Sequence, residues 1–147
     1  MTSSEIDMSV GTEWLVDAEG CSAELLRDVE TIRRVCDQII SDLDLRVVGE
    51  GRWHEFPHPG GVTGLFLLTE SHLACHTYPE LGVATFNLYC CKHRPDWLWE
   101  KQLTAALCAS VVTVRVAQRG ASAGRGDDSY LADAQKRVTF AQGVRKR

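Results

Sequence analysis

Apolar residues recur along the chain with two spacings, and each spacing predicts one kind of element. From residue 23 to about 43 they return every three or four positions, which is the repeat of one helix face. Ser22 precedes this run as a candidate helix cap, and a second helix is predicted from Pro95 to about residue 110. The first stripe consists of Leu25, Leu26, Val29, Ile32, Val35, Cys36, Ile39 and Ile40.

Shorter apolar or alternating runs predict β-strands. The segment 52–60 contains Pro57 and Pro59 and is predicted to be a loop. Two of the strands are expected to form a hairpin around Ser71. The predicted strands cover residues 12–17, 45–50, 61–69, 73–78, 82–90 and 111–117.

The order of these elements predicts an α+β fold. We expect a two-layer α/β sandwich, in which one antiparallel-rich sheet carries two helices on one face. The other face must be covered or meet water, and packing two such sheets together in a dimer would bury it. The chain length suits one domain, which we place at residues 1–118.

Charge is unevenly distributed along the chain. Residues 1–118 carry 9 Lys/Arg and 17 Asp/Glu, a net charge of −8, whereas residues 119–147 carry 7 and 3, a net charge of +4. An acidic body argues against nucleic-acid binding. The segment 119–147 is predicted to be a basic, flexible C-terminal tail.

Composition also bears on location. The sequence holds no apolar run near the roughly 20 residues that span a membrane. Residues 1–10 lack the basic start and apolar core of a signal peptide, so we expect a cytoplasmic protein with no membrane partner. In that compartment the six cysteines should be reduced thiols.

The candidate chemistry centres on Glu70-Ser71, with a histidine five residues further on and a cysteine twenty residues further on. The Ser71 hydroxyl can attack the Glu70 carbonyl and convert the peptide bond into an ester. Removal of the Ser71 α-proton then expels the ester and leaves dehydroalanine, which hydrolyses to a pyruvoyl group at a new N-terminus. His76 can transfer the proton, because imidazole titrates near neutral pH.

Strand alternation relates the neighbouring side chains. Leu73 and Cys75 should face one side of the sheet, and His72 and His76 the other. Pairing with residues 61–69 is expected to bring Thr63 near the turn, where its hydroxyl could bind the acyl-shift intermediate.

A pyruvoyl ketone suits one reaction in particular. It forms a Schiff base with a substrate amine and accepts the electrons left by departing CO2. The resulting carbanion needs a proton on carbon, and the Cys91 thiol is the candidate donor.

This pattern resembles the prokaryotic S-adenosylmethionine decarboxylases, which are pyruvoyl enzymes that cut their own chain at a Glu-Ser bond. The likeness extends over about residues 11–117, including Gly61-Val62-Thr63-Gly64. Its most specific part is the string Glu70-Ser71-His72-Leu73-Ala74-Cys75-His76-Thr77-Tyr78-Pro79-Glu80, followed by Cys91 at the matching distance.

The resemblance implies roles by position. It implies cleavage between residues 70 and 71, a covalent pyruvoyl cofactor from Ser71, and a homodimer of processed protomers with sites at the interface. The substrate would be S-adenosylmethionine, and the product would serve spermidine biosynthesis. The implied processing residues are Glu70, Ser71, Thr63 and His76; the implied proton donor is Cys91; the implied substrate-binding residues are Phe56, Glu80 and the backbone at Leu73.

Two departures leave the substrate open. Asn87 stands where the family usually has Asp, and Lys92 where it commonly has Gly. A pyruvoyl-dependent arginine or ornithine decarboxylase on the same fold is therefore an alternative, and the sequence does not decide whether putrescine activates.

Alternatives of another class are a regulatory homologue that is never cleaved and a non-catalytic zinc-binding domain. Zinc would need four convergent ligands. Because strand alternation turns Cys75 away from His72 and His76, we expect no metal site. The candidate ligands are His72, Cys75, His76, Cys90, Cys91 and His93.

Overall fold

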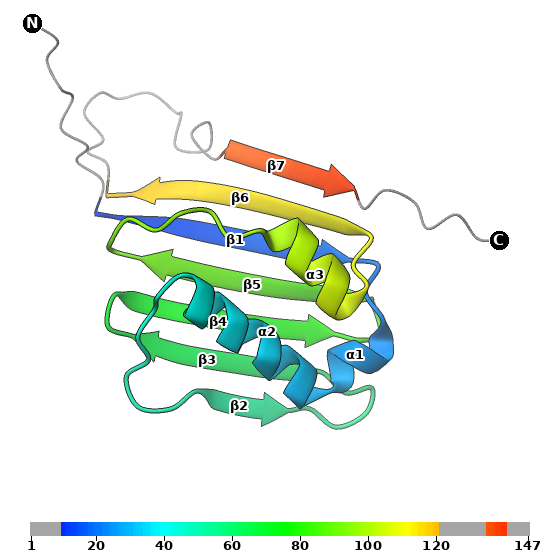
Figure 1. Ribbon diagram of the computed structural model, residues 1–147. Helices are drawn as coiled ribbons and strands as arrows, with labels where there is room; N and C mark the ends of the chain where they lie inside the picture. Colours follow the sequence, from blue (N-terminus) through cyan, green and yellow to red (C-terminus); the bar gives the residue numbers. More distant parts are fainter. Residues whose placement is uncertain (1–9, 121–134, 141–147) are drawn as a thin grey trace, which may run out of the picture.

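A seven-stranded antiparallel sheet forms one layer of the protein (Figure 1). The computed structural model describes residues 10–120 and 135–140. The strands lie in the order β2-β3-β4-β5-β1-β6-β7, so that the N-terminal strand sits between β5 and β6. Their bounds are β1 Gly11–Glu19, β2 Arg52–Glu55, β3 Val62–Leu68, β4 Ser71–Tyr78, β5 Val83–Cys90, β6 Val111–Arg119 and β7 Gln135–Phe140.

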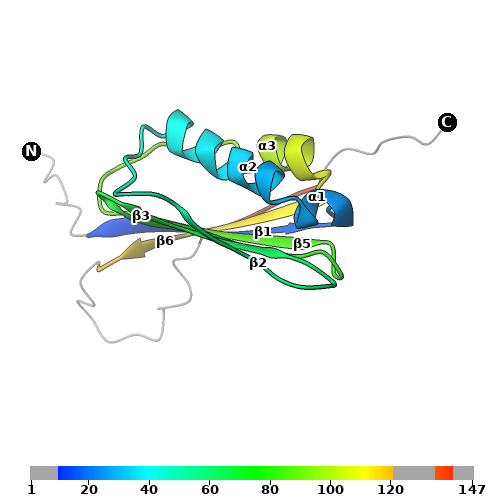
Figure 2. The same ribbon diagram turned by 90° about the horizontal axis from the view of Figure 1, so that it is seen from below.

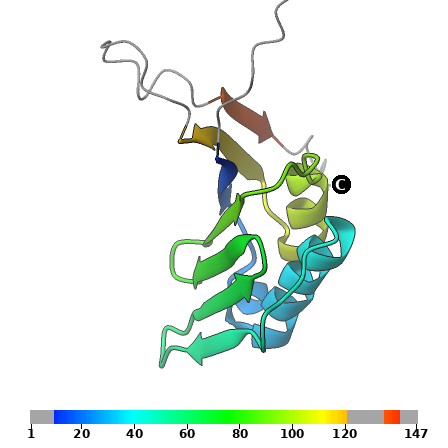
Figure 3. The ribbon, with the colours of Figure 1, turned by 90° about the vertical axis from the view of Figure 1, so that its left-hand side faces the viewer.

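Three helices form the second layer, all on one face of the sheet (Figures 2 and 3). They are α1 Ala23–Arg27, α2 Val29–Asp42 and α3 Trp99–Leu107. The core lies between the two layers, and the predicted α+β sandwich is confirmed. The side chains that fill the core include Val16, Leu26, Ile32, Ile39, Leu73, Phe86, Leu88, Leu103 and Leu107. No helix in the described part of the chain is both long and apolar enough to cross a membrane.

The predicted helix over residues 23–43 is in fact two helices. Asp28 has extended backbone angles, φ −82° and ψ 104°, and its side chain accepts a hydrogen bond from the Thr31 N–H. An aspartate that bonds the backbone ahead of it starts a helix rather than continuing one. The prediction of two helices is therefore wrong by one, although the apolar stripe still faces the sheet. Ser22 caps α1, as predicted.

Two strand assignments from the sequence are also wrong. Residues 45–50 make only one isolated bridge, Val47 to Leu68, whereas the predicted loop 52–60 contains β2. β2 gains its place because the Trp53 ring covers Gly64 on β3, where a side-chain carbon would come within 2.5 Å of the ring. The contact joins Trp53 to Gly64 on another strand, and local sequence propensity does not predict such a contact.

The segment 119–147, predicted to be a flexible tail, holds a strand that the sequence did not indicate. β7 pairs antiparallel with β6, Val112 opposite Thr139, and extends the sheet by one strand. The rest of the segment beyond residue 120 lies outside the described residues.

The side of the sheet away from the helices, which we call the open face, carries the candidate chemistry. On β4 the side chains of Leu73 and Cys75 are buried under the helices, whereas His72 and His76 alternate onto the open face, as predicted. Three leucines on this face are largely exposed. They are Leu15, Leu65 and Leu67, with 39%, 50% and 60% of their surface accessible.

Candidate active site

Ser71 stands at a tight turn between β3 and β4. Thr69 and Glu70 alone form the turn, since Leu68 pairs directly with Ser71. The φ angle of Ser71 is +143°, a conformation that residues with a side chain rarely adopt. Such backbone strain costs on the order of 1–3 kcal/mol and persists only where the surrounding structure enforces it. The peptide bond before Ser71 is therefore held in a strained connection.

The carbonyl of Glu70 is already polarised by a backbone donor. The N–H of Cys91 donates to this oxygen at 2.9 Å, because Ser71 pairs with Cys90 and Cys91 directly follows β5. A donor aimed at a carbonyl that is attacked stabilises the negative charge that develops on its oxygen. The structure thus brings together three residues that the sequence singled out, namely Glu70, Ser71 and Cys91.

The Glu70 side chain is buried and paired. Its carboxylate is 2.6 Å from the Arg94 guanidinium, and only 3% of the residue is accessible. The sequence analysis did not single out Arg94, whose partner lies 24 positions earlier in the chain. A buried carboxylate needs such a partner, and the pair fixes the turn from its side-chain end.

The two adjacent cysteines differ in their surroundings. Cys90 points into the core, and burial, together with the nearby Glu70 charge, raises the pKa of its thiol to about 11. Cys91, just beyond the end of β5, is exposed. Cys91 is therefore the thiol that a bound molecule can reach.

A chain of polar side chains begins at Ser71 and crosses the open face. The Ser71 hydroxyl lies 3.0 Å from Nδ1 of His72, and Nε2 of His72 lies 3.0 Å from Oδ1 of Asn87. The Asn87 amide nitrogen donates to Glu13 at 2.8 Å, and Glu13 also bonds Arg119.

This chain of side chains was missed in the sequence analysis, which assigned His72 no catalytic role. The only sequence signal was the Glu-Ser-His string itself, because the other members come from β5, β1 and β6.

His76 belongs to a second cluster at the far end of the hairpin. Its Nδ1 is 2.5 Å from the Thr63 hydroxyl, and its ring packs against Phe56 and Tyr78 with centroids 5.3 and 4.4 Å apart. Glu80 lies just beyond Tyr78 in the exposed turn that leads to β5.

The prediction that Thr63 lies near the Ser71 turn is wrong. In the antiparallel register Leu68 faces Ser71, so the residue five positions before Leu68, Thr63, faces His76. His76 lies five positions after Ser71 along the strand, about 16 Å at roughly 3.3 Å per residue. Within one chain, therefore, His76 does not reach the serine it was predicted to serve.

A shallow cavity of about 350 Å³ lies on the open face between the two clusters. Its wall includes Thr63 and His76 at one end and Asn87 at the other. Leu73, the predicted backbone contact for the substrate, is fully buried beneath this face.

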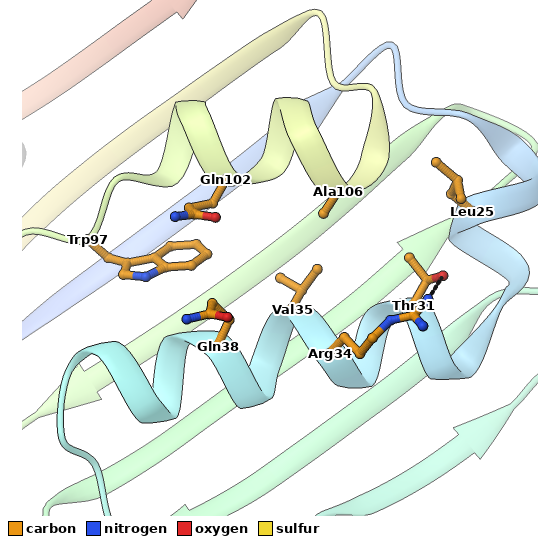
Figure 4. A pocket seen from close by; sticks show the side chains of 8 residues that line it. All are labelled: Leu25, Thr31, Arg34, Val35, Gln38, Trp97, Gln102 and Ala106. Carbon is orange, nitrogen blue, oxygen red and sulfur yellow. Dashed lines mark hydrogen bonds between the residues drawn. The ribbon is translucent and has the colours of Figure 1, made fainter.

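A second cavity, of about 280 Å³, lies between α2 and α3 on the opposite side of the sheet (Figure 4). It contains none of the predicted site residues. Its lining residues are Leu25, Thr31, Arg34, Val35, Gln38, Trp97, Gln102 and Ala106.

The zinc alternative finds no support in the part of the chain that the structure describes. No three His, Cys, Asp or Glu side chains there gather closely enough to hold a metal ion. Cys75 points into the core, where its sulfur is 3.7 Å from that of Cys36.

Comparisons with known proteins agree on one family. The family model described as S-adenosylmethionine decarboxylase matches residues 12–120. A relative from Symbiobacterium thermophilum, named S-adenosylmethionine decarboxylase proenzyme, is 37% identical over 114 residues, which are 77% of this chain and 85% of that protein. A relative of the same name from Caldanaerobacter subterraneus is 33% identical over 115 residues, 76% of this chain and 90% of that one.

A solved structure is similar as well. The adenosylmethionine decarboxylase from Aquifex aeolicus superimposes with a TM-score of 0.66 and 27% sequence identity, covering 82% of this chain and 98% of that one.

Proposed function

The chain belongs to the S-adenosylmethionine decarboxylase family, and from this premise we propose that it is a pyruvoyl-dependent carboxy-lyase acting on S-adenosylmethionine. Its product, decarboxylated S-adenosylmethionine, would enter spermidine biosynthesis. The protein would be made as a proenzyme and would mature by cutting itself between Glu70 and Ser71.

One observation carries this proposal, which is the geometry of the scissile peptide. Ser71 is strained at φ +143°, and the carbonyl before it accepts the Cys91 N–H at 2.9 Å. The backbone strain at Ser71 favours loss of the planar amide between Glu70 and Ser71. The Cys91 N–H stabilises the tetrahedral intermediate of an acyl shift. A pyruvoyl group made from Ser71 therefore fits these residues.

When formed, that group would supply the carbonyl that condenses with the substrate amine and takes up the electron pair left by CO2. Cys91 would protonate the substrate carbon, because its exposed thiol sits on the residue whose backbone touches the Glu70 carbonyl. Its neighbour Cys90 is buried in the core and has no access to the open face.

We assign His76 and Thr63 to a site shared between two copies of the chain. The pair is about 16 Å from Ser71 of the same chain, whereas both ends lie on the open face with its exposed leucines. Packing two open faces around a twofold axis would bury those leucines and could turn the His76 cluster of one protomer toward Ser71 of the other.

Substrate binding is proposed for three positions in this shared site. Phe56 presents an exposed aromatic ring beside His76, suited to an adenine or a sulfonium cation. The carboxylate of Glu80 suits a pair of ribose hydroxyls. The backbone at Leu73 would contact the nucleoside, with residues 1–118 as the catalytic domain.

Mass spectrometry under denaturing conditions tests the self-cleavage. Purified protein should give two fragments, residues 1–70 and 71–147, and the larger one should react with phenylhydrazine. The Ser71→Ala variant should remain one chain and release no CO2. Wild-type protein that stays whole and does not react with the carbonyl reagent would contradict the proposal.

Substrate identity is tested with the matured enzyme. Carbon dioxide release should be much faster with S-adenosylmethionine than with arginine or ornithine at equal concentration. Faster release from either amino acid would shift the assignment to that substrate while leaving the self-cleavage intact.

A further inference from the structure

We infer that His72 is the general base that takes the hydroxyl proton of Ser71 during self-cleavage, and that Asn87 and Glu13 are positioning residues that hold it in the tautomer this requires. The inference rests on the proposed self-cleavage, since it assigns the first proton transfer of that reaction. It assigns His72 a separate role from that of His76.

The hydrogen bonds determine the tautomer of His72, starting from Glu13, the carboxylate at the end of the chain of bonds away from Ser71. Glu13 bonds Arg119 and receives the Asn87 amide nitrogen at 2.8 Å. An ionised carboxylate only accepts, so the nitrogen of the Asn87 amide faces Glu13 and its oxygen faces His72. That oxygen also only accepts, which makes Nε2 of His72 the protonated nitrogen.

Nδ1 of His72 is then unprotonated, and its lone pair is available to the Ser71 hydroxyl. It lies 3.0 Å from the hydroxyl oxygen, within the range of a proton-transfer hydrogen bond. The arrangement gives the serine hydroxyl an acceptor before any substrate is present. A histidine with the opposite tautomer would donate to the serine and could not accept its proton.

Glu13 is kept in the ionised form that the chain of bonds needs. Partial burial raises its pKa, but the hydrogen bonds from Asn87 and Arg119 outweigh burial, and the net pKa lies below the ordinary value. The groups around His72 on the open face are Leu67 of β3, Asn87 and Tyr89 of β5, Glu13 of β1 and Arg119 of β6.

The proton balance of the step is complete without any further reactant. The Ser71 proton passes to Nδ1 of His72 as the hydroxyl oxygen bonds the Glu70 carbonyl carbon. The negative charge on the carbonyl oxygen is held by the Cys91 N–H. When the carbon–nitrogen bond breaks, the Ser71 nitrogen leaves as an amine and takes the proton back from His72.

Cleavage kinetics of the freshly folded full chain test the role. His72→Ala should slow fragment formation by about 100-fold or more, the usual contribution of a general base, and added imidazole should restore part of the rate. His93→Ala, which removes an exposed histidine close in sequence to Cys91, is the matched control and should cleave like wild type.

A charge exchange provides a readout that a purely structural role would not affect. In the double variant Glu13→Gln/Asn87→Asp the same hydrogen bonds can form, but the carboxylate now contacts His72 directly. It should favour protonated His72, so the pH of half-maximal cleavage rate should rise by about one unit. Thermal unfolding of each variant reports whether the fold is intact.

The outcomes separate this inference from the proposed function. If wild type cleaves, Ser71→Ala does not, and a folded His72→Ala cleaves at the wild-type rate, the inference is overturned while the self-cleavage stands. An unchanged pH profile in the charge-exchange variant also overturns it. If wild type itself never cleaves, both ideas fail together.

Discussion

At the scale of single residues, the contact between Cys91 and Glu70 would join maturation to turnover in the proposed mechanism. The backbone N–H of Cys91 donates to the Glu70 carbonyl, the proposed cleavage point, whereas its thiol is exposed. A substitution at this position leaves the N–H in place and changes only the thiol. The two functions can therefore be separated in one variant.

We predict that Cys91→Ala still matures into two fragments but releases CO2 at least about 100-fold more slowly, as expected when a proton donor is lost. Fragment formation is measured by mass spectrometry and turnover by CO2 release. Cys108→Ala removes the other exposed thiol and should leave both unchanged. Undiminished CO2 release by Cys91→Ala would remove the thiol from the mechanism.

How much of the site the sequence predicts depends on how its residues are linked. Ser71 and Cys91 meet across neighbouring strands of a meander, and a hairpin around Ser71 follows from the local pattern. The bonds of His72 through Asn87 to Glu13 require β1 to lie beside β5, a pairing across 74 residues. Nothing in the local sequence indicates this neighbour.

At the scale of elements, Asp28 decides where one helix ends and the next begins. Its carboxylate accepts bonds from the Thr31 hydroxyl at 2.5 Å and the Thr31 N–H at 3.2 Å. The hydroxyl bond is the main reason that the pKa of Asp28 lies below its ordinary value of 3.8. The predicted single helix failed here, because one side chain competes with the backbone bond that would continue it.

We predict that Asp28→Ala lowers the thermal unfolding midpoint by several degrees at pH 7, because α2 loses its cap. Asp28→Asn keeps an acceptor at the same place but loses the charge, so its midpoint should lie between those of wild type and Asp28→Ala at that pH. The midpoints are measured by circular dichroism.

The comparison with Asn also fixes the sign of the pH effect. Because the folded-state pKa of Asp28 is depressed, its stabilisation is complete above about pH 4 and is lost as the pH falls through the lowered pKa. The advantage of wild type over Asp28→Asn should therefore shrink as the pH falls below about 4. An advantage that grew on acidification would contradict the assigned hydrogen bonds.

At the scale of the whole molecule, the two-layer arrangement follows from the sequence but the composition of the site does not. The apolar stripe of the helices and the alternation in β4 correctly predict one covered face and one open face. Register, however, sets Thr63 opposite His76 and far from Ser71. A shared site is a property of two chains, so the pattern of one chain does not reveal its geometry.

We predict that two inactive variants complement each other. Ser71→Ala and His76→Ala should each remain uncleaved when expressed alone. Expressed together, they should form mixed dimers in which His76 of the Ser71→Ala chain serves the intact Ser71 of its partner. With equal expression and random pairing, about half of the His76→Ala chains should then appear as fragments in mass spectrometry.

Mixed expression of Ser71→Ala with the double variant Ser71→Ala/His76→Ala is the control, because it contains no usable serine. Rapid cleavage of His76→Ala by itself, or its complete failure to cleave in the mixture, would contradict a site shared between protomers.

The sheet order has a consequence for the protein after the proposed cut between Glu70 and Ser71. Of the two pieces, the first contributes β1, β2 and β3 and the second contributes β4, β5, β6 and β7, yet β1 is inserted between β5 and β6. Three strand pairs therefore join the two fragments, namely β3–β4, β5–β1 and β1–β6. Neither fragment can dissociate without disrupting the sheet. The cut protein should therefore remain folded as one unit. After unfolding, however, the two fragments would lack the covalent link that held them together during the first folding, so refolding should be much harder than for the uncut chain.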